Sequence, residues 1–257
     1  IWQLPTTAVL HCDAAHEGLY AGWGGVLNGT QQARGNFPIE DARSKHINFF
    51  EMKAVELTLR TFVEQLRDRQ VLVYTDSGVV MRVLRNLTTR SPQLMAALRE
   101  LLDVTFRYNI RLDVRHIAGV DNVLADKLSR LISNEDWQVS PRLFHQLQQR
   151  WGEVTIDRFA SYGNNLLARF NSEYSCPGSA GVDAFSQDWR LHPVTGAVEF
   201  NWWNPPWSRI PQVLRKIQTD EAEGILVVPA WPSAVWWPRM RQVANQLEVI
   251  PASAEIS

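Results

Sequence analysis

Short apolar runs and helical patterns alternate along the first half of the chain. Apolar runs bounded by turn residues predict strands, and apolar residues at helical spacing predict helices. The predicted strands cover residues 8–12, 22–27, 33–39, 71–75 and 111–117, and the predicted helices cover 48–66, 78–87, 93–107 and 121–131. Three strands, a helix, a strand, further helices, a strand and a closing helix predict an α/β fold with a mixed five-stranded sheet.

The polar stretch SNEDWQVSP, residues 133–141, predicts a linker. We therefore expect two domains, residues 1–134 and residues 135–257. A chain of 257 residues with 45% hydrophobic content is long enough for two cores. Most of its 11 tryptophans lie beyond the linker, so the two parts also differ in composition.

Four acidic residues carry most of the functional signal. Asp13 and Asp76 each end a strand-like run, and Glu51 and Asp126 each lie in a helical pattern. Carboxylates brought together at the ends of buried elements repel one another and lose hydration. Hard divalent cations offset this repulsion, and a pair of them makes a site for phosphoryl transfer.

The charge is divided unevenly between the two parts. Residues 1–134 carry 16 Lys+Arg and 14 Asp+Glu, a net charge of +2, and residues 135–257 carry 10 and 13, a net charge of −3. With the four candidate metal ligands set aside, the first part has a net charge of +6. That balance suits a domain that meets a phosphate backbone.

Cysteine content and hydropathy suggest the compartment. Cys12 and Cys176 lie far apart and indicate neither a disulfide framework nor a zinc site. The sequence shows no signal peptide and no apolar run of membrane-spanning length. We therefore expect an intracellular protein, cytoplasmic or nuclear, with no membrane partner.

The motifs around the four acids resemble ribonuclease H, specifically the RNase H domain of retroelement polyproteins. They are HCDAAHEGLYAGWGGVL, HINFFEMKAVELTL, YTDS and HIAGVDNVLADKLSR, in that order over residues 6–132. The resemblance implies an endonuclease that cleaves the RNA strand of RNA–DNA hybrids. It implies two Mg²⁺ ions, replaceable by Mn²⁺, held by Asp13, Glu51, Asp76 and Asp126.

Three further residues in these motifs have expected roles. Histidine has an unperturbed pKa near neutrality, so His116 is expected to assist catalysis by moving a proton or helping product release. Asn48 and Asn122 are expected to contact the substrate, where a 2′-hydroxyl marks the RNA strand.

Other readings of these residues stay open. An Asp at a strand end can serve a turn, a helical Glu can belong to a solvated face, and Asn48 can cap the helix of Glu51. No Lys-rich segment lies between the middle helices to grip a hybrid. A domesticated, non-catalytic module that serves as a structural or nucleic-acid-binding part of a larger complex is therefore the alternative.

A second motif, Asn204-Pro205-Pro206-Trp207, follows the strand-like run AVEFNWW. The Asn side chain and a proline carbonyl can accept hydrogen bonds from a base amino group, while the Trp stacks on the extruded base. Together with VTIDRFASYGN, VDAFSQDW and VVPAWPSAVWW, this motif resembles the phage Dam-type adenine-N6 methyltransferases over residues 139–245. The resemblance implies a smaller Rossmann-like α/β domain.

In that family resemblance, Asp157 lies in a pocket for S-adenosylmethionine. No Gly-rich turn follows the first strand, although a closely approaching cofactor usually needs one. Arg158 and Phe159 are bulky where that loop is expected to be open. Adenine-N6 methylation is therefore a second alternative function, beside a degenerate domain that only packs.

The succession of the two domains is similar to the polyproteins of DIRS-type tyrosine-recombinase retrotransposons. The chain begins with Ile1 rather than Met, consistent with a piece of a longer polyprotein. The resemblance implies a reverse transcriptase domain upstream of residue 1 as a partner. A host protein derived from such an element would carry the same motifs.

Overall fold

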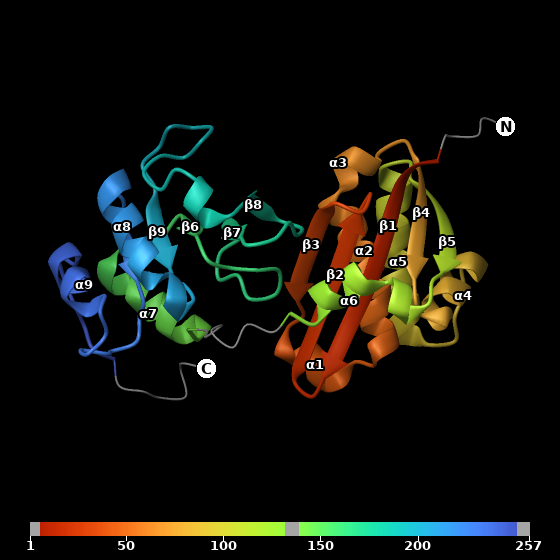
Figure 1. Ribbon diagram of the computed structural model, residues 1–257, viewed down its shortest axis with the longest axis horizontal. Coiled ribbons are helices and arrows are strands. Elements are labelled where there is room, and N and C mark those ends of the chain that lie inside the picture. Colours follow the sequence, from red (N-terminus) through yellow and green to blue (C-terminus); the bar gives the residue numbers. More distant parts are fainter. Residues whose placement is uncertain (1–5, 132–138, 251–257) are drawn as a thin grey trace. The chain divides into compact units, whose positions relative to one another are not determined.

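A computed structural model describes residues 6–131 and 139–250 (Figure 1). The chain divides into two compact units. The first contains the described residues up to 131 and also residues 174–177, and the second contains the remainder. In these described residues, no helix has both the length and the apolar character needed to cross a bilayer.

The first unit is a mixed five-stranded sheet in the order β3-β2-β1-β4-β5. Strands β1, β2 and β3 pair antiparallel, whereas β4 and β5 run parallel to β1. The strands are β1 (Thr6–Glu17), β2 (Tyr20–Leu27), β3 (Gln31–Asn36), β4 (Gln70–Thr75) and β5 (Arg111–His116). The helices are α1 (Ile39–Ser44), α2 (Ile47–Thr61), α3 (Val63–Leu66), α4 (Gly78–Asn86), α5 (Pro92–Arg107), η1 (Gly119–Asp121) and α6 (Val123–Ser129).

This architecture confirms the predicted fold class of the first half. Several boundaries differ from the prediction, and two of these differences change the elements themselves. The third strand ends at Asn36, and Pro38 then caps a short helix α1 that the apolar pattern did not indicate. The helix expected over 48–66 is interrupted at Phe62, whose ψ of 18° leaves helical geometry.

Glycines in β2 allow helices to approach the sheet closely from both faces. A Cβ on Gly24 would lie 2.4 Å from the Ala125 carbonyl oxygen of α6. A Cβ on Gly25 would lie 2.1 Å from Thr58 Oγ1 of α2. Since successive strand residues face opposite sides, α2 covers one face and α6 the other (Figure 1). The G-x-G-G pattern is therefore a packing requirement of this sheet.

Residues 174–177 complete the edge of the first unit. Ser175 forms a parallel bridge with Ala33 of β3, and its carbonyl accepts a 3.1 Å hydrogen bond from Arg34 N. The Arg34 guanidinium also lies 5.6 Å from the centre of the Tyr174 ring. An edge strand exposes unpaired backbone groups, and this segment covers part of that edge.

The second unit is a parallel five-stranded sheet in the order β10-β9-β6-β7-β8. Its strands are β6 (Ile156–Asp157), β7 (Phe170–Ser172), β8 (Ser179–Val182), β9 (Phe200–Trp203) and β10 (Glu223–Leu226). Its helices are α7 (Pro141–Trp151), η2 (Ala184–Ser186), η3 (Trp207–Arg209), α8 (Ile210–Asp220) and α9 (Trp237–Val243). The predicted second α/β domain is confirmed, and its strands are short, with two to four residues each.

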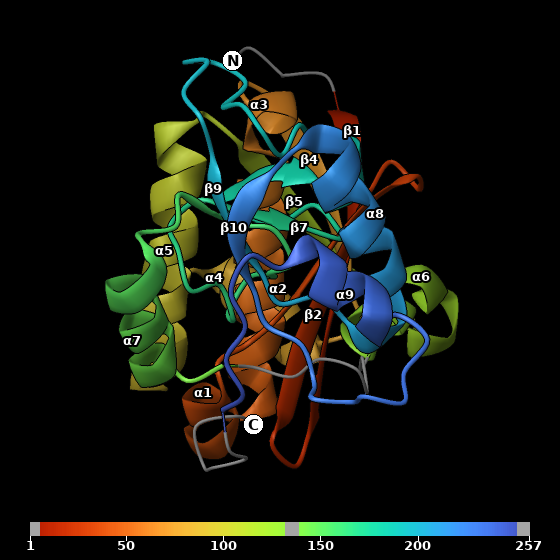
Figure 2. The ribbon, with the colours of Figure 1, turned by 90° about the vertical axis from the view of Figure 1, so that its left-hand side faces the viewer.

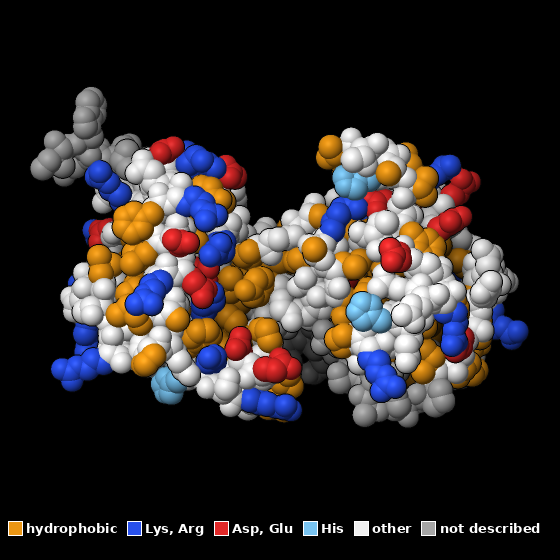
Figure 3. All heavy atoms as spheres, turned by 180° about the vertical axis from the view of Figure 1, so that it is seen from behind, with side chains coloured by type: hydrophobic (Ala, Val, Ile, Leu, Met, Phe, Trp, Pro, Cys, Tyr) orange, Lys and Arg blue, Asp and Glu red, His pale blue; other side chains and the backbone are white. Residues whose placement is uncertain are grey.

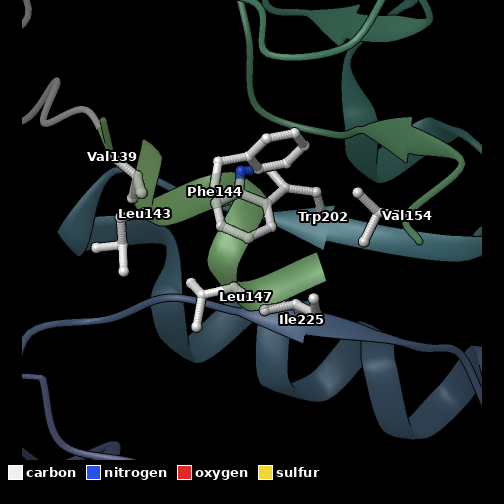
Figure 4. Close-up of a cluster of buried hydrophobic side chains, with 7 residues drawn as sticks. All are labelled: Val139, Leu143, Phe144, Leu147, Val154, Trp202 and Ile225. Carbon is white, nitrogen blue, oxygen red and sulfur yellow. The ribbon is translucent and has the colours of Figure 1, made fainter. Parts of the chain in front are cut away.

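Adjacent tryptophans in β9 serve two cores. Trp202 packs beneath α7, where its ring meets Phe144 edge-on at 4.8 Å between centroids (Figure 4). Trp203 faces the other side and packs with Val213 of α8 and with Trp189. Figure 2 shows α7 on one side of β9 and β10, and α8 with α9 on the other. The tryptophan-rich composition of the second half therefore supplies buried area on both faces of a small sheet.

We expect Gly24→Ala to lower the free energy of unfolding of the first unit by about 2 kcal/mol, because the added Cβ collides with α6 backbone that cannot easily move. Gly78→Ala is the matched control, since a Cβ there meets nothing within 4 Å. Urea unfolding of both variants, followed by circular dichroism, measures the difference. An equal effect of the two substitutions would show that α6 does not pack this closely.

Candidate metal centre and second-unit site

Three of the four predicted acids converge in the first unit. Asp13 lies in β1, Glu51 in the second turn of α2, and Asp76 directly after β4. One carboxylate oxygen from each lies within 4.8 Å of the other two. The parallel register that places His11 opposite Tyr74 explains part of this geometry. Two residues further along each strand, Asp13 and Asp76 then project from the same face.

Burial and mutual repulsion act strongly on this cluster. Asp13 is 3% exposed and Glu51 is 8% exposed. Burial, with the charges of Asp13 and Asp76 adding to it, raises the pKa of Glu51 to about 9. Burial also raises the pKa of Asp13 to about 6, although the Ser129 hydroxyl donates to it across 2.5 Å. Two of the three carboxyls therefore resist ionisation without a nearby cation.

The donor set fits a hard divalent cation. All three groups offer carboxylate oxygens, which Mg²⁺ and Mn²⁺ prefer, and the group contains no thiolate or imidazole. Glu51 Oε2 is buried and has no hydrogen-bond partner among the described residues. A cation at this position would give that oxygen a partner and would remove the repulsion.

Asp126 lies beside this group but outside it. It belongs to α6 and is about half exposed, and its Oδ1 accepts a 2.6 Å bond from Arg130 Nε. Arg130 Nη1 also lies 2.9 Å from Glu17 Oε1. The charge of Asp126 contributes to the raised pKa of Asp13, so the two carboxyls interact. The structure thus brings the fourth predicted acid near the centre, paired with a cation of its own.

His116 lies at the edge of the same centre. It ends β5 and is exposed, and its Nε2 is 3.1 Å from the Asp76 backbone oxygen. The following loop is also close, because a Cβ on Gly119 would lie 3.2 Å from Asp76 Oδ2. An exposed imidazole here can reach a substrate that contacts Asp76.

The two predicted substrate contacts differ in accessibility. Asn48 lies half-buried in the first turn of α2, and His46, not Asn48, caps this helix through its Nδ1. The capping alternative for Asn48 is therefore wrong. Asn122 is 1% exposed, and its Nδ2 donates to the Cys12 carbonyl across 3.1 Å. In this conformation Asn122 joins the start of α6 to β1 rather than facing substrate.

The second unit places its two predicted motifs on neighbouring strands. Asp157 ends β6, the Asn204 motif follows β9, and Asp157 is opposite Trp202 in the parallel register. From this central pair the chain continues to β7 and β8 on one side and to β10 on the other. Ligands of parallel α/β sheets bind at the carboxyl ends of the strands at such a switch point.

Asp157 holds the loop that follows it. Its two carboxylate oxygens accept hydrogen bonds of 3.3 Å from the backbone nitrogens of Phe159 and Leu166. Burial raises the pKa of Asp157 to about 6. The side chain is thus engaged with the loop backbone, so its effect on any ligand is to shape that loop.

The bulky residues after β6 are turned inward. Arg158 is buried, and its guanidinium donates to Asn201 Oδ1 at 2.7 Å and Asn171 Oδ1 at 2.9 Å. Phe159 packs against Phe185, with ring centroids 5.4 Å apart. Arg158 thus joins the strands of the second sheet through hydrogen bonds, and Phe159 packs against the cluster around Trp189.

An aromatic pair lies beyond the same strand ends. Trp207 follows β9 and is 36% exposed, and Trp231 follows β10 and is 43% exposed. Their rings meet edge-on at 4.9 Å between centroids. This arrangement leaves aromatic surface accessible beside the Asn204 motif.

Sequence reasoning missed Ser129, Arg130 and Trp231. Ser129 and Arg130 follow Asp126 by three and four residues, so helical spacing could have placed them on its side of α6. Trp231 could have been found from its position after the strand next to β9. The charged side chains on the face seen in Figure 3 are intermingled in sign, in keeping with the small net charge of each half.

Without divalent cations, we expect the first unit to lose stability as the pH rises. Glu51 has a raised pKa when folded, so its contribution is fully present below about pH 4.5 and is lost as the pH rises through about 9. Glu51→Gln removes this group, so the free energy of unfolding of the variant relative to the wild type should increase with pH, by at most about 1.4 kcal/mol per pH unit.

Urea unfolding in a chelator from pH 5 to pH 9 measures this difference. Saturating Mg²⁺ should flatten the wild-type profile, because the cation favours the ionised carboxylates. A constant difference between wild type and Glu51→Gln across the range would contradict the raised pKa.

The two halves of the chain are similar to different known proteins. Residues 130–255 match the family model described as DNA N-6-adenine-methyltransferase (Dam). No curated protein matches the chain at a significant level.

Solved structures similar to the first half include several ribonucleases H. RNase H1 of the halophilic archaeon Halobacterium salinarum NRC-1 is 19% identical, with 47% of this chain and 92% of that chain covered and a TM-score of 0.41. LC11-RNase H1 in complex with an RNA/DNA hybrid is 21% identical, with 48% and 93% covered and a TM-score of 0.41. The prototype foamy virus protease-reverse transcriptase is 18% identical, with 49% and 21% covered and a TM-score of 0.37. The first unit thus has a mixed five-stranded sheet, and residues 130–255, which include most of the second unit, match the Dam family model.

Proposed function

We propose that the first domain, residues 1–134, is a metal-dependent ribonuclease H that cleaves the RNA strand of RNA–DNA hybrids. The observation that carries this proposal is the convergence of Asp13, Glu51 and Asp76, with a buried Glu51 oxygen that lacks a partner among the described residues. Holding three carboxylates together, two of them buried, is unfavourable without a cation. A structural role alone would not require such a cluster.

Each residue has a defined part in this proposal. Asp13, Glu51 and Asp76 hold the cations, and Asp126 completes the set from α6. Two divalent cations would supply an activated water and would stabilise the departing 3′ oxygen. His116, exposed beside Asp76, transfers a proton or assists product release. Asn48, at the start of α2, contacts the minor groove of the hybrid.

The setting that we propose is reverse transcription of a retroelement. The support is the order of the two domains and the motifs of the first, with a reverse transcriptase domain of the same polyprotein as partner. The modest net charge of the first half agrees with this, because an attached polymerase would supply part of the grip on the hybrid.

We expect Asp76→Asn to reduce hybrid cleavage in Mg²⁺ or Mn²⁺ by at least several hundredfold, because a ligand that neutralises cation charge is lost. The fold should be retained, since the substitution relieves like-charge repulsion. Asp103→Asn, an exposed acid on α5, is the matched control and should cleave at the wild-type rate. A labelled RNA–DNA hybrid analysed on a denaturing gel reports the cut.

Normal cleavage by Asp76→Asn would reject the site assignment. Absence of cleavage by the wild type under both metals, together with tight co-purification in a large assembly, would favour the non-catalytic module. Repeating the assay with an attached reverse transcriptase domain separates that outcome from a missing partner.

Adenine-N6 methylation by the second domain, residues 135–257, is the second candidate function. The placement of Asp157 and Asn204 after adjacent parallel strands favours it. The Arg158 guanidinium is turned inward and donates to Asn201 Oδ1, so it does not project from the loop after β6 beside which S-adenosylmethionine would bind. Asn204, Pro205, Pro206 and Trp207 would then hold the amino group and stack on the extruded base.

We expect calorimetry to show binding of S-adenosylmethionine to the wild-type chain. Asp157→Asn should weaken binding by roughly tenfold, because the loop loses a charge-assisted hydrogen bond. Asn204→Ala should bind the cofactor as the wild type does and should lose methyl transfer to DNA. Failure of the wild type to bind at millimolar concentration would remove this candidate.

A further inference from the structure

Arg130 is the cation that lies at the candidate metal centre. Its Nε is 2.6 Å from Asp126 Oδ1, and its Nη1 is 2.9 Å from Glu17 Oε1. The same guanidinium acts on the buried acids, because its charge opposes the rise in the pKa of both Asp13 and Glu51. Arg130 therefore offsets part of the carboxylate repulsion in the metal-free chain.

The end of α6 is fixed at this centre. Ser129 Oγ donates to Asp13 Oδ2, and a Cβ on Gly22 would lie 2.4 Å from the Ser129 carbonyl oxygen. Helix α6 is thus joined to β1 and packed against β2 beside Asp126. The present partner of Asp126 is Arg130, and the Asp126 oxygens are not part of the group formed by the three converging acids.

We propose that Arg130 is an internal counter-ion of the metal centre, which holds Asp126 in an ion pair and has to release it before Asp126 can serve a second divalent cation. This inference rests on the proposed function. A guanidinium and a metal ion compete for one carboxylate, because both are cations and Asp126 Oδ1 is already engaged. Both side chains of the pair are about half exposed, so the pair is weak and the exchange is reversible.

The position of Arg130 lets it act on Asp126 through a direct ion pair. It lies four residues after Asp126, where a helix brings two side chains together. Lys127 is exposed and has the same positive charge as Arg130. It directly follows Asp126 in sequence, so its side chain lies on another face of α6. A general electrostatic effect would act through both residues, whereas an ion pair acts through Arg130 alone.

We expect Arg130→Gln to tighten the weaker Mn²⁺ site of the full chain by about fivefold in the absence of nucleic acid, the scale of an exposed ion pair. Lys127→Gln, the matched control, should change that affinity by less than about twofold. Calorimetric titration of Mn²⁺, with electron paramagnetic resonance to count bound ions, measures both.

A double-mutant cycle assigns the effect to Asp126. In an Asp126→Asn background, Arg130→Gln should no longer change Mn²⁺ affinity. Equal effects of Arg130→Gln and Lys127→Gln, or an effect that persists without Asp126, would overturn the counter-ion role and leave the metal centre intact. Absence of Mn²⁺ binding by the wild type would overturn both the proposed function and this inference.

Discussion

The first unit is organised around the repulsion of three carboxylates within one small volume. Asp13, Glu51 and Asp76 come from a strand, a helix and a strand end, and the burial of Asp13 and Glu51 removes water that would otherwise separate the charges. Such an arrangement is unfavourable on its own, so the surrounding fold has to hold it. The rigid parts of the fold are those that fix these three elements relative to one another.

Close packing of α2 and α6 on opposite faces of β2 provides that rigidity. Gly24 and Gly25 allow both helices to approach, and Asn122 and Ser129 then join α6 to β1 by hydrogen bonds to Cys12 and Asp13. The apolar core supplies the stability, whereas these polar contacts set the position of the site. Holding the acids close together thus lowers the stability of the first unit, as is common for functional centres.

Much of this could be predicted from sequence because the signals are local. The strands and helices of the first half follow from apolar period, and the converging acids lie in recognisable motifs. Helical spacing indicates the Arg130–Asp126 pair, but it does not indicate that Arg130 also meets Glu17, which lies 113 residues away in β1. The burial of Asn122 was also beyond local pattern, since its partner Cys12 lies 110 residues away.

The second unit was harder to predict for a physical reason. Strands of two to four residues have too few positions to show an apolar period. In addition, only six residues join β7 to β8, whereas parallel strands usually require a longer crossover. In the second unit the motifs around Asp157 and Asn204 were more informative than the periodicity of apolar residues. Asp157 and Asn204 lie far apart in sequence, yet the pairing of β6 with β9 brings their strand ends together. In both units the candidate chemistry thus lies where two parallel neighbours, β1 with β4 and β6 with β9, bring polar side chains to one edge of a sheet.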